Sequence, residues 1–181
     1  MTVLGVLADT HIPDRSRGLH PDILPVFREA GVEAILHAGD VSAPGVLQEL
    51  EEIAPVFAVQ GNRDWVLLGH LPRRQFLTFE GVDLVLEHGH GRWRNYLVDR
   101  THYLLFGMQV SRYRNRLLAS YPQVRVIVYG HLHIPEISWV GDRLMFNPGS
   151  ASVPQKKLTP SVGLLNIQAG GEIEGEIIEL F

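Results

Sequence analysis

Hydrophobic runs and amphipathic segments alternate along the first third of the chain. The run from Val3 to Ala8 is short, apolar and rich in β-branched residues, which is typical of a buried strand. Gly31 and Pro55 each follow a segment of helical character, and both residues commonly mark helix ends. The resulting β-α-β-α-β order predicts a sheet covered by helices. We expect strands over 3–8, 34–36 and 56–59, and helices over 19–30 and 43–54.

Turn residues between short hydrophobic runs mark the rest of the chain. Glu80-Gly81, Gly141-Asp142 and the stretch Ala169-Gly170-Gly171 each separate two such runs, which predicts three β-hairpins. A further buried strand is predicted over 124–128. Since no linker or internal repeat is apparent, we expect one domain over residues 1–181. The hairpin strands are expected over 75–79 and 82–86, 137–140 and 143–146, and 162–167 and 173–178.

Composition narrows the chemistry that the chain can carry. The sequence has 181 residues, a net charge of −4 and no cysteine. Disulfides and thiolate metal sites are therefore excluded, and any metal ion must be held by nitrogen and oxygen. The mild negative charge argues against nucleic-acid binding by the molecule as a whole. Neither a signal peptide nor a membrane-spanning run is apparent, so we expect a cytoplasmic protein without membrane contact.

Aspartate, asparagine and histidine recur at the carboxyl ends of the predicted strands. Ligands of open α/β sheets bind beyond these ends, so the side chains converge there if the strands are neighbours. Imidazole and carboxylate together suit manganese, iron, cobalt, nickel or zinc. A carboxylate can also bridge two such ions, which a neutral imidazole cannot do. The predicted metal ligands are Asp9, His11, Asp40, Asn62, His88, His131 and His133.

Six short motifs in a fixed order resemble those of the calcineurin-like metallophosphoesterases, and most of all the small single-domain phosphodiesterases of that superfamily. They are Asp9-Thr10-His11, Gly39-Asp40, Gly61-Asn62-Arg63-Asp64, His88-Gly89-His90, Gly130-His131-Leu132-His133 and Asn147-Pro148-Gly149-Ser150. The resemblance implies a four-layer α/β/β/α sandwich. It also implies one metal ion on Asp9, His11, Asp40 and His133, and a second on Asp40, Asn62, His88 and His131, with Asp40 bridging.

The same resemblance implies a phosphodiesterase that attacks phosphate esters with hydroxide formed at a pair of divalent metal ions. Manganese is the favoured metal, with nickel, cobalt, iron and zinc as alternatives. The expected substrate is a small phosphodiester or a nucleotide. Two other functions stay open, a phosphomonoesterase and a non-catalytic protein scaffold like the retromer subunit of this superfamily. Such a scaffold need not keep every metal ligand, whereas this chain has all seven.

The third motif departs from the family pattern, because Arg63 stands where many relatives have histidine or cysteine. Arginine cannot donate a proton near neutral pH, but it can clamp a phosphate through two hydrogen bonds. His90 therefore becomes the candidate acid for the leaving group. Asp64 is expected either to orient a ligand histidine or to serve as a turn or helix cap. His37 is expected to pack near the site without binding metal.

Residues 92–125 hold seven arginines but only one carboxylate, Asp99, with aromatic and aliphatic residues between them. We expect two helices broken near Gly107. Relatives usually have a shorter connection here, so residues 92–121 are interpreted as an Arg-rich helical insertion. Three roles stay open for it: an amphipathic helix pair with solvated or paired arginines, a lid or contact between identical subunits, and a basic aromatic surface for nucleotide or single-stranded nucleic acid.

Overall fold

A computed structural model describes every residue of the chain except Arg92, and every side chain except those of residues 92–97, 100 and 106. The helices are α1 (Ile23–Glu29), α2 (Pro44–Glu51), α3 (Trp93–Phe106) and α4 (Val110–Ser120). The strands are β1 (Thr2–Leu7), β2 (Ala34–His37), β3 (Val56–Ala58), β4 (Arg74–Phe79), β5 (Val82–Glu87), β6 (Val126–Tyr129), β7 (Pro135–Val140), β8 (Arg143–Pro148), β9 (Ser161–Ile167) and β10 (Ile173–Glu179).

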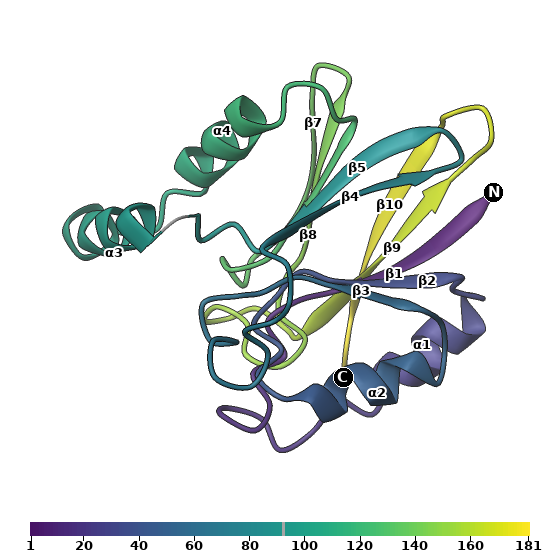
Figure 1. The fold of residues 1–181 in the computed structure, drawn as a ribbon, viewed down its shortest axis with the longest axis horizontal. Helices are drawn as coiled ribbons and strands as arrows, with labels where there is room; N and C mark the ends of the chain where they lie inside the picture. Colours follow the sequence, from purple (N-terminus) through teal and green to yellow (C-terminus); the bar gives the residue numbers. More distant parts are fainter. Residues whose placement is uncertain (92) are drawn as a thin grey trace.

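The strands form two mixed five-stranded sheets that lie between layers of helices (Figure 1). The first sheet has the order β10-β9-β1-β2-β3, and the second has the order β4-β5-β6-β8-β7. Helices α1 and α2 cover the outer face of the first sheet, and α4 covers the outer face of the second. This arrangement confirms the expected α/β/β/α sandwich.

Alternating side chains assign the two faces of each sheet to different layers, as the period of a strand requires. In β1, Val6 packs between the sheets, whereas its neighbour Leu7 packs against residues of α1 and α2. In β6, Val128 likewise packs between the sheets, whereas Ile127 packs against Leu117 of α4. Both faces of these central strands are therefore buried, which explains their nearly continuous hydrophobic sequence.

Most predicted elements form, with shifted ends. The first expected helix begins only at Ile23, because residues 21–22 form a turn before it. Gly31 follows this helix with a φ of 64°, as expected of a glycine beyond a helix C-terminus. All three hairpins are present. No described helix is long and apolar enough to cross a membrane.

The Arg-rich segment forms α3 and α4, separated at Gly107, whose φ is 74°. The break near this glycine is therefore confirmed. Helix α4 buries Tyr113, Leu117 and Leu118 against the second sheet. Helix α3 projects from the body beside α4 (Figure 1), and it leaves Leu104 76% exposed.

Several arginines of this segment are engaged in structural contacts. Arg112 and Arg116 both form ion pairs with the buried carboxylate of Asp99. Arg114 pairs with Glu136, with 3.1 Å between Nη1 and Oε1. Arg125 donates to the backbone carbonyl of a glycine near β10. These contacts favour the interpretation of a paired helical segment. Arg92 and the side chains of Arg94 and Arg100 lie outside the described part of the structure.

Candidate metal centre

The predicted ligands follow strands whose carboxyl ends meet at one edge of the sandwich. Strands β1, β2 and β3 are parallel neighbours, so Asp9, Asp40 and Asn62 emerge at the same edge of the first sheet. Strands β5 and β6 are parallel in the second sheet and bring His88 and His131 to its corresponding edge. Parallel pairing of these strands therefore brings the predicted ligands, which are distant in sequence, to one edge of the sandwich.

Two backbone contacts tie these edges to each other. The imidazole Nδ1 of His88 lies 2.7 Å from the carbonyl oxygen of Ala38, which precedes the Asp40 turn. The backbone N–H of His131 donates to Oδ2 of Asp9 across 2.9 Å. Each contact links a residue of one sheet to a residue of the other, so the two halves of the centre are held in a fixed relation.

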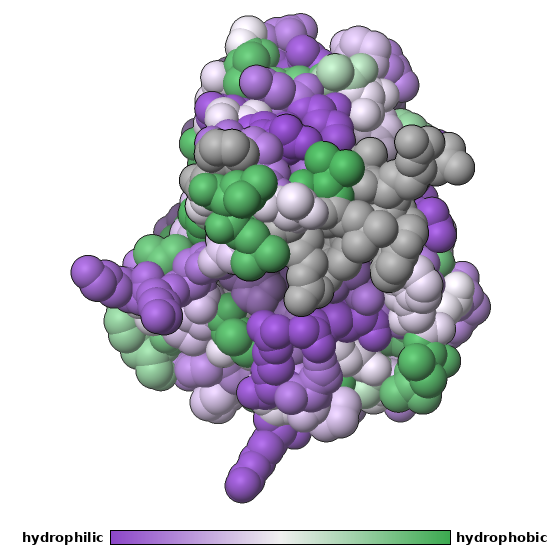
Figure 2. Space-filling model, turned by 90° about the vertical axis from the view of Figure 1, so that its left-hand side faces the viewer, coloured by the Kyte–Doolittle hydropathy of each residue, from purple (hydrophilic) through white to green (hydrophobic). Residues whose placement is uncertain are grey.

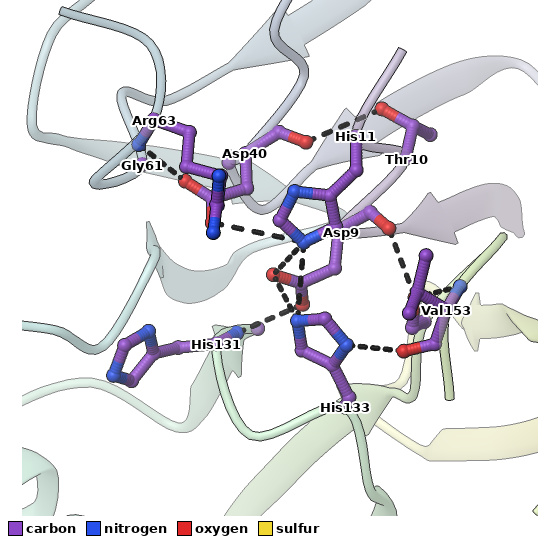
Figure 3. Close-up of polar contacts among 12 residues, drawn as sticks. Asp9, Thr10, His11, Asp40, Gly61, Arg63, His131, His133 and Val153 are labelled. Carbon is purple, nitrogen blue, oxygen red and sulfur yellow. Dashed lines mark hydrogen bonds and ion pairs between the residues drawn. The ribbon is translucent and has the colours of Figure 1, made fainter. Parts of the chain in front are cut away.

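Histidines converge on the carboxylate of Asp9, which is fully buried (Figure 3). Its Oδ1 lies 3.3 Å from Nε2 of His133, 3.8 Å from Nε2 of His11 and 3.9 Å from Nε2 of His88. The ligand atoms of two groups lie close enough to hold a cation, Asp9 with His11 and His133, and Asp9 with Asp40 and His88.

The carboxylate of Asp40 lies between two imidazoles. Its Oδ1 is 3.5 Å from Nε2 of His88, and its Oδ2 is 3.8 Å from Nε2 of His11. The amide oxygen of Asn62 lies 3.2 Å from the same nitrogen of His88. The ring of His131 lies at the His88 side, with 5.0 Å between the ring centroids, and points away from Asp9 (Figure 3).

The donor set fits a cation because imidazole nitrogens face buried oxygens. Nδ1 of His88 donates to a backbone carbonyl, so its Nε2 faces the oxygens of Asp40 and Asn62, where it can carry a proton or bind a metal ion. His133 likewise donates from Nδ1 to the carbonyl of Val153, which turns its Nε2 toward Asp9. Oδ1 of Asp9 is buried and accepts no hydrogen bond from the described residues. Such a cluster requires a proton or a metal ion at its centre.

The electrostatics of the cluster also favour a positive charge. Burial by itself would lower the pKa of His88, but the charges of Asp40 and Asp9 raise that pKa to about 10. Burial would raise the pKa of Asp40, yet His88 and His11 hold it far below the usual range. Burial lowers the pKa of His11 to about 4. The buried carboxylates therefore favour positive charge at the His88 side and leave His11 as a neutral ligand.

Residues of the Asn147–Ser150 turn contact the loops that carry the predicted ligands. Asn147 donates to the carbonyl of Gly130, directly before His131, across 3.0 Å. Ser150 donates from Oγ to the carbonyl of Asp9 across 2.9 Å. These contacts hold the Asn147–Ser150 turn against the loops that carry His131 and Asp9. The carbonyl of Val153, which orients His133, was not foreseen, because a backbone acceptor leaves no signal in the residue type.

His37 packs beneath the site as expected. It is fully buried, accepts the backbone N–H of Gly39 at Nδ1, and lies 3.1 Å from Oγ1 of Thr10 through Nε2. Thr10 donates onward to the carbonyl of Val41 across 3.2 Å. Both ring nitrogens of His37 are therefore occupied within the protein, and none is available for a metal ion.

Five of the predicted ligand residues adopt left-handed backbone conformations, which few non-glycine residues do. Their φ values are 55° for Asp9, 50° for His11, 53° for Asp40, 71° for His131 and 55° for His133. Strained backbone of this kind clusters at functional sites, where the surrounding structure maintains it. The turns that follow these strands are therefore made by the predicted ligands themselves, and before Asp40 also by Gly39, whose φ is 89°.

Two of the predicted catalytic residues, Arg63 and His90, lie in different surroundings. Nη1 of Arg63 pairs with Oδ2 of Asp14 at 2.7 Å, and its backbone N–H donates to Oδ1 of Asp40 at 2.8 Å. His90 lies 5.2 Å from the His88 ring centroid. Burial, together with the charge of His88, lowers the pKa of His90 to about 4. His90 is therefore neutral at pH 7 in the metal-free protein.

Asp64 does not orient a ligand histidine, so that interpretation is wrong. Its two carboxylate oxygens accept the backbone N–H groups of Ser42 and Gly61, each at 2.7 Å. Burial raises the pKa of Asp64. The side chain thus holds the Asp40 and Asn62 loops together, as the alternative expectation of a turn-stabilising role predicts.

Comparisons with known proteins agree with this geometry. The model of the calcineurin-like phosphoesterase superfamily domain matches residues 1–170. A probable metallophosphoesterase of Methanothermobacter thermautotrophicus is 37% identical over 177 residues, which are 97% of this chain and 91% of that protein. Phosphodiesterase YfcE of Escherichia coli K12 is 30% identical over 164 residues, covering 80% of this chain and 78% of the relative.

A solved structure of the same fold has lower sequence identity. Vps29 of Chaetomium thermophilum superimposes with a TM-score of 0.74 at 21% identity, covering 98% of this chain and 94% of the other. At this identity the likeness concerns the fold alone.

Proposed function

The chain belongs to the calcineurin-like phosphoesterase superfamily and is a metal-dependent phosphoester hydrolase, and we propose that it cleaves small phosphodiesters with two divalent metal ions. The observation that supports this proposal best is the position of Asp40, whose two oxygens face His88 and His11 respectively. Two ions about 3.5–4 Å apart need a shared ligand, and a carboxylate so placed can serve both.

We assign the ligands as the family resemblance implies. One ion takes Asp9, His11, Asp40 and His133, and the other takes Asp40, Asn62, His88 and His131. Manganese is the favoured metal, and nickel, cobalt, iron and zinc suit the same nitrogen and oxygen donors. Such a pair of ions supplies a water of lowered pKa as nucleophile and positive charge for the phosphate oxygens.

The remaining side chains position the substrate. Arg63 is the proposed phosphate clamp, because its pairing with Asp14 through Nη1 leaves further N–H donors for two phosphate oxygens. His90 is the proposed group beside the leaving oxygen. Since its pKa of about 4 leaves it neutral at pH 7, it can act as an acid only if a bound phosphate raises that pKa. Asp64 acts by holding the Asp40 and Asn62 loops together.

Phosphodiesters are the proposed substrates because the Escherichia coli relative is named a phosphodiesterase. The fold likeness to Vps29 leaves a scaffold function as the alternative.

A homo-oligomer through residues 92–121 is also proposed, since α3 exposes Tyr103, Leu104 and Leu105. Figure 2 shows hydrophobic side chains at this end of the molecule. The single domain over 1–181 and the cytoplasmic location stay predictions, as does nucleotide or nucleic-acid binding.

A metal and substrate panel tests the proposed function. Chelator-treated protein is assayed with bis(p-nitrophenyl) phosphate and with p-nitrophenyl phosphate after addition of manganese, nickel, cobalt, zinc or magnesium. We expect metal-stimulated turnover that favours the diester and disappears in Asp40→Ala, whereas Asp142→Ala, in the exposed turn between β7 and β8, retains it. Turnover in Asp40→Ala would contradict the bridging role. Inactivity with every metal would favour the scaffold.

A further inference from the structure

A cavity of about 470 Å³ opens beside the metal centre, between the start of β4, the end of β5 and α4. His88 and His90 form part of its wall, so the cavity is continuous with the place where the phosphodiester would react. Its volume lies within the range of pockets that bind small molecules. Hydrolysis of one phosphodiester at the metal centre does not by itself require this cavity.

Positive charge dominates the cavity. Arg73, Arg74 and Arg116 line it, against one carboxylate, Glu87. The two sides come from separate parts of the chain, since Arg74 begins β4, Arg73 directly precedes it, and Arg116 lies on α4. An anionic group in the cavity would therefore meet guanidinium groups on both sides, an arrangement suited to binding phosphate oxygens.

The three arginines differ in how far the protein itself occupies them. Arg116 pairs with Asp99 and donates to the carbonyl of Gly89 across 2.7 Å. Arg74 donates to the hydroxyl of Tyr121 across 3.4 Å. Arg73 makes no hydrogen bond or ion pair with any residue in the described part of the chain, and it is exposed. Arg73 is therefore the cation that a ligand could engage without breaking an existing contact.

The cavity also has an apolar wall formed by Leu117 and Tyr121. The Tyr121 hydroxyl donates to Glu87, and the ring of Tyr121 packs edge-on against Phe76 with 5.9 Å between centroids. Both contacts fix the orientation of the ring. Because Leu117 is 1% exposed and Tyr121 3% exposed, they form the floor of the cavity, and a ligand would meet mainly the arginines at its sides.

We propose that this cavity binds a second phosphate of the substrate, held by Arg73 together with Arg74 and Arg116. The preferred substrates are then small phosphodiesters that carry a further terminal phosphate. This inference rests on the proposed phosphodiesterase function, because the first phosphate must occupy the metal centre. It goes beyond that function by naming a distinguishing feature of the substrate and the residues that recognise it.

A matched pair of substrates tests the cavity. Thymidine 5′-(p-nitrophenyl phosphate) is compared with the same compound bearing a 3′-phosphate, with manganese present. We expect kcat/KM to be at least about tenfold higher for the 3′-phosphorylated compound, as a charge-assisted contact allows. Arg73→Ala should remove most of this preference and Arg73→Glu should reverse it. Arg28→Ala, on the exposed face of α1, should leave the preference unchanged.

Binding measurements separate this proposal from the proposed function. Titration calorimetry compares thymidine 3′,5′-bisphosphate with thymidine 5′-monophosphate on wild-type protein and on Arg73→Ala. Tighter binding of the bisphosphate that depends on Arg73 supports the cavity even if no diester is hydrolysed. If wild type and Arg73→Ala show equal substrate preference and equal binding while diester turnover is intact, the cavity proposal is wrong and the proposed hydrolase function is unaffected.

Discussion

The Nε2 atoms of His11 and His133 lie 3.2 Å apart, although 122 positions separate the two residues in sequence. Because Nδ1 of His133 donates to the carbonyl of Val153, its Nε2 is directed at the other ring. Oδ1 of Asp9 lies 3.3 Å from the same nitrogen. Three possible ligand atoms thus converge in a buried space, an arrangement suited to a metal ion.

A bound cation should therefore stabilise the fold. With manganese at about a hundred times its dissociation constant, linkage predicts about 2.7 kcal/mol of stabilisation, or a rise in Tm of about 5–10 °C for a chain of this length. Differential scanning calorimetry of chelator-treated protein, with and without manganese, measures the shift. His133→Ala should lose most of it, whereas His70→Ala, an exposed histidine, should keep it. An equal shift in both variants would remove His133 from the site.

The edge at which the predicted ligands meet could be predicted from the sequence because strands end where polar residues begin. Asp40 and His131 follow hydrophobic runs typical of buried strands, and parallel pairing brings such ends together. The role of Asp64 was ambiguous, because a carboxylate next to a site can accept from a histidine or from backbone. The contact between Asp64 and the N–H groups of Ser42 and Gly61 depends on how two loops approach, which residue types do not encode.

Gly61 should be essential through its lack of a side chain. A Cβ at this position would overlap Oδ1 and the backbone nitrogen of Asp40, whereas one at Gly18 would meet nothing within 4 Å. Gly61→Ala must therefore displace the proposed bridging carboxylate, because its backbone neighbour cannot give way. We expect this variant to lose metal affinity and metal-dependent turnover. Titration with manganese measures the affinity, and Gly18→Ala should match wild type. Retained affinity in Gly61→Ala would show that the added Cβ does not displace the Asp40 carboxylate.

Gly81 should matter for stability alone. It has a φ of 77° in the turn between β4 and β5, and a Cβ there would meet no atom within 4 Å. Gly81→Ala therefore isolates the backbone cost and should lower the free energy of unfolding by about 1–2 kcal/mol. Gly45 lies in α2 with the same open space, so Gly45→Ala should raise that free energy by up to about 1 kcal/mol. Urea unfolding measures the free energy of unfolding of both variants. Equal changes of the same sign would contradict a backbone effect that depends on φ.

His37 should make the metal-free protein acid-sensitive. Its Nδ1 accepts the N–H of Gly39, so protonation would place two donors face to face. Burial lowers the pKa of His37 from about 6.5 to about 3. Between these values the unfolded chain binds a proton that the folded chain does not, so this contribution to stability is complete above about pH 6.5 and falls as the pH decreases. The slope from one such group is about 1.4 kcal/mol per pH unit.

Urea unfolding of chelator-treated protein between pH 4 and pH 7 measures that slope. His37→Gln cannot titrate, so its free energy of unfolding should depend less steeply on pH than that of wild type, whatever the substitution costs at pH 7. His70→Gln removes an exposed histidine and should keep the wild-type slope. The slopes are compared because His11 and His131 also have lowered pKa values. These two residues contribute to the pH dependence of the free energy of unfolding in every variant. Parallel curves for wild type and His37→Gln would mean that His37 is already protonated in the folded protein, or that the acid-labile step lies elsewhere in the centre.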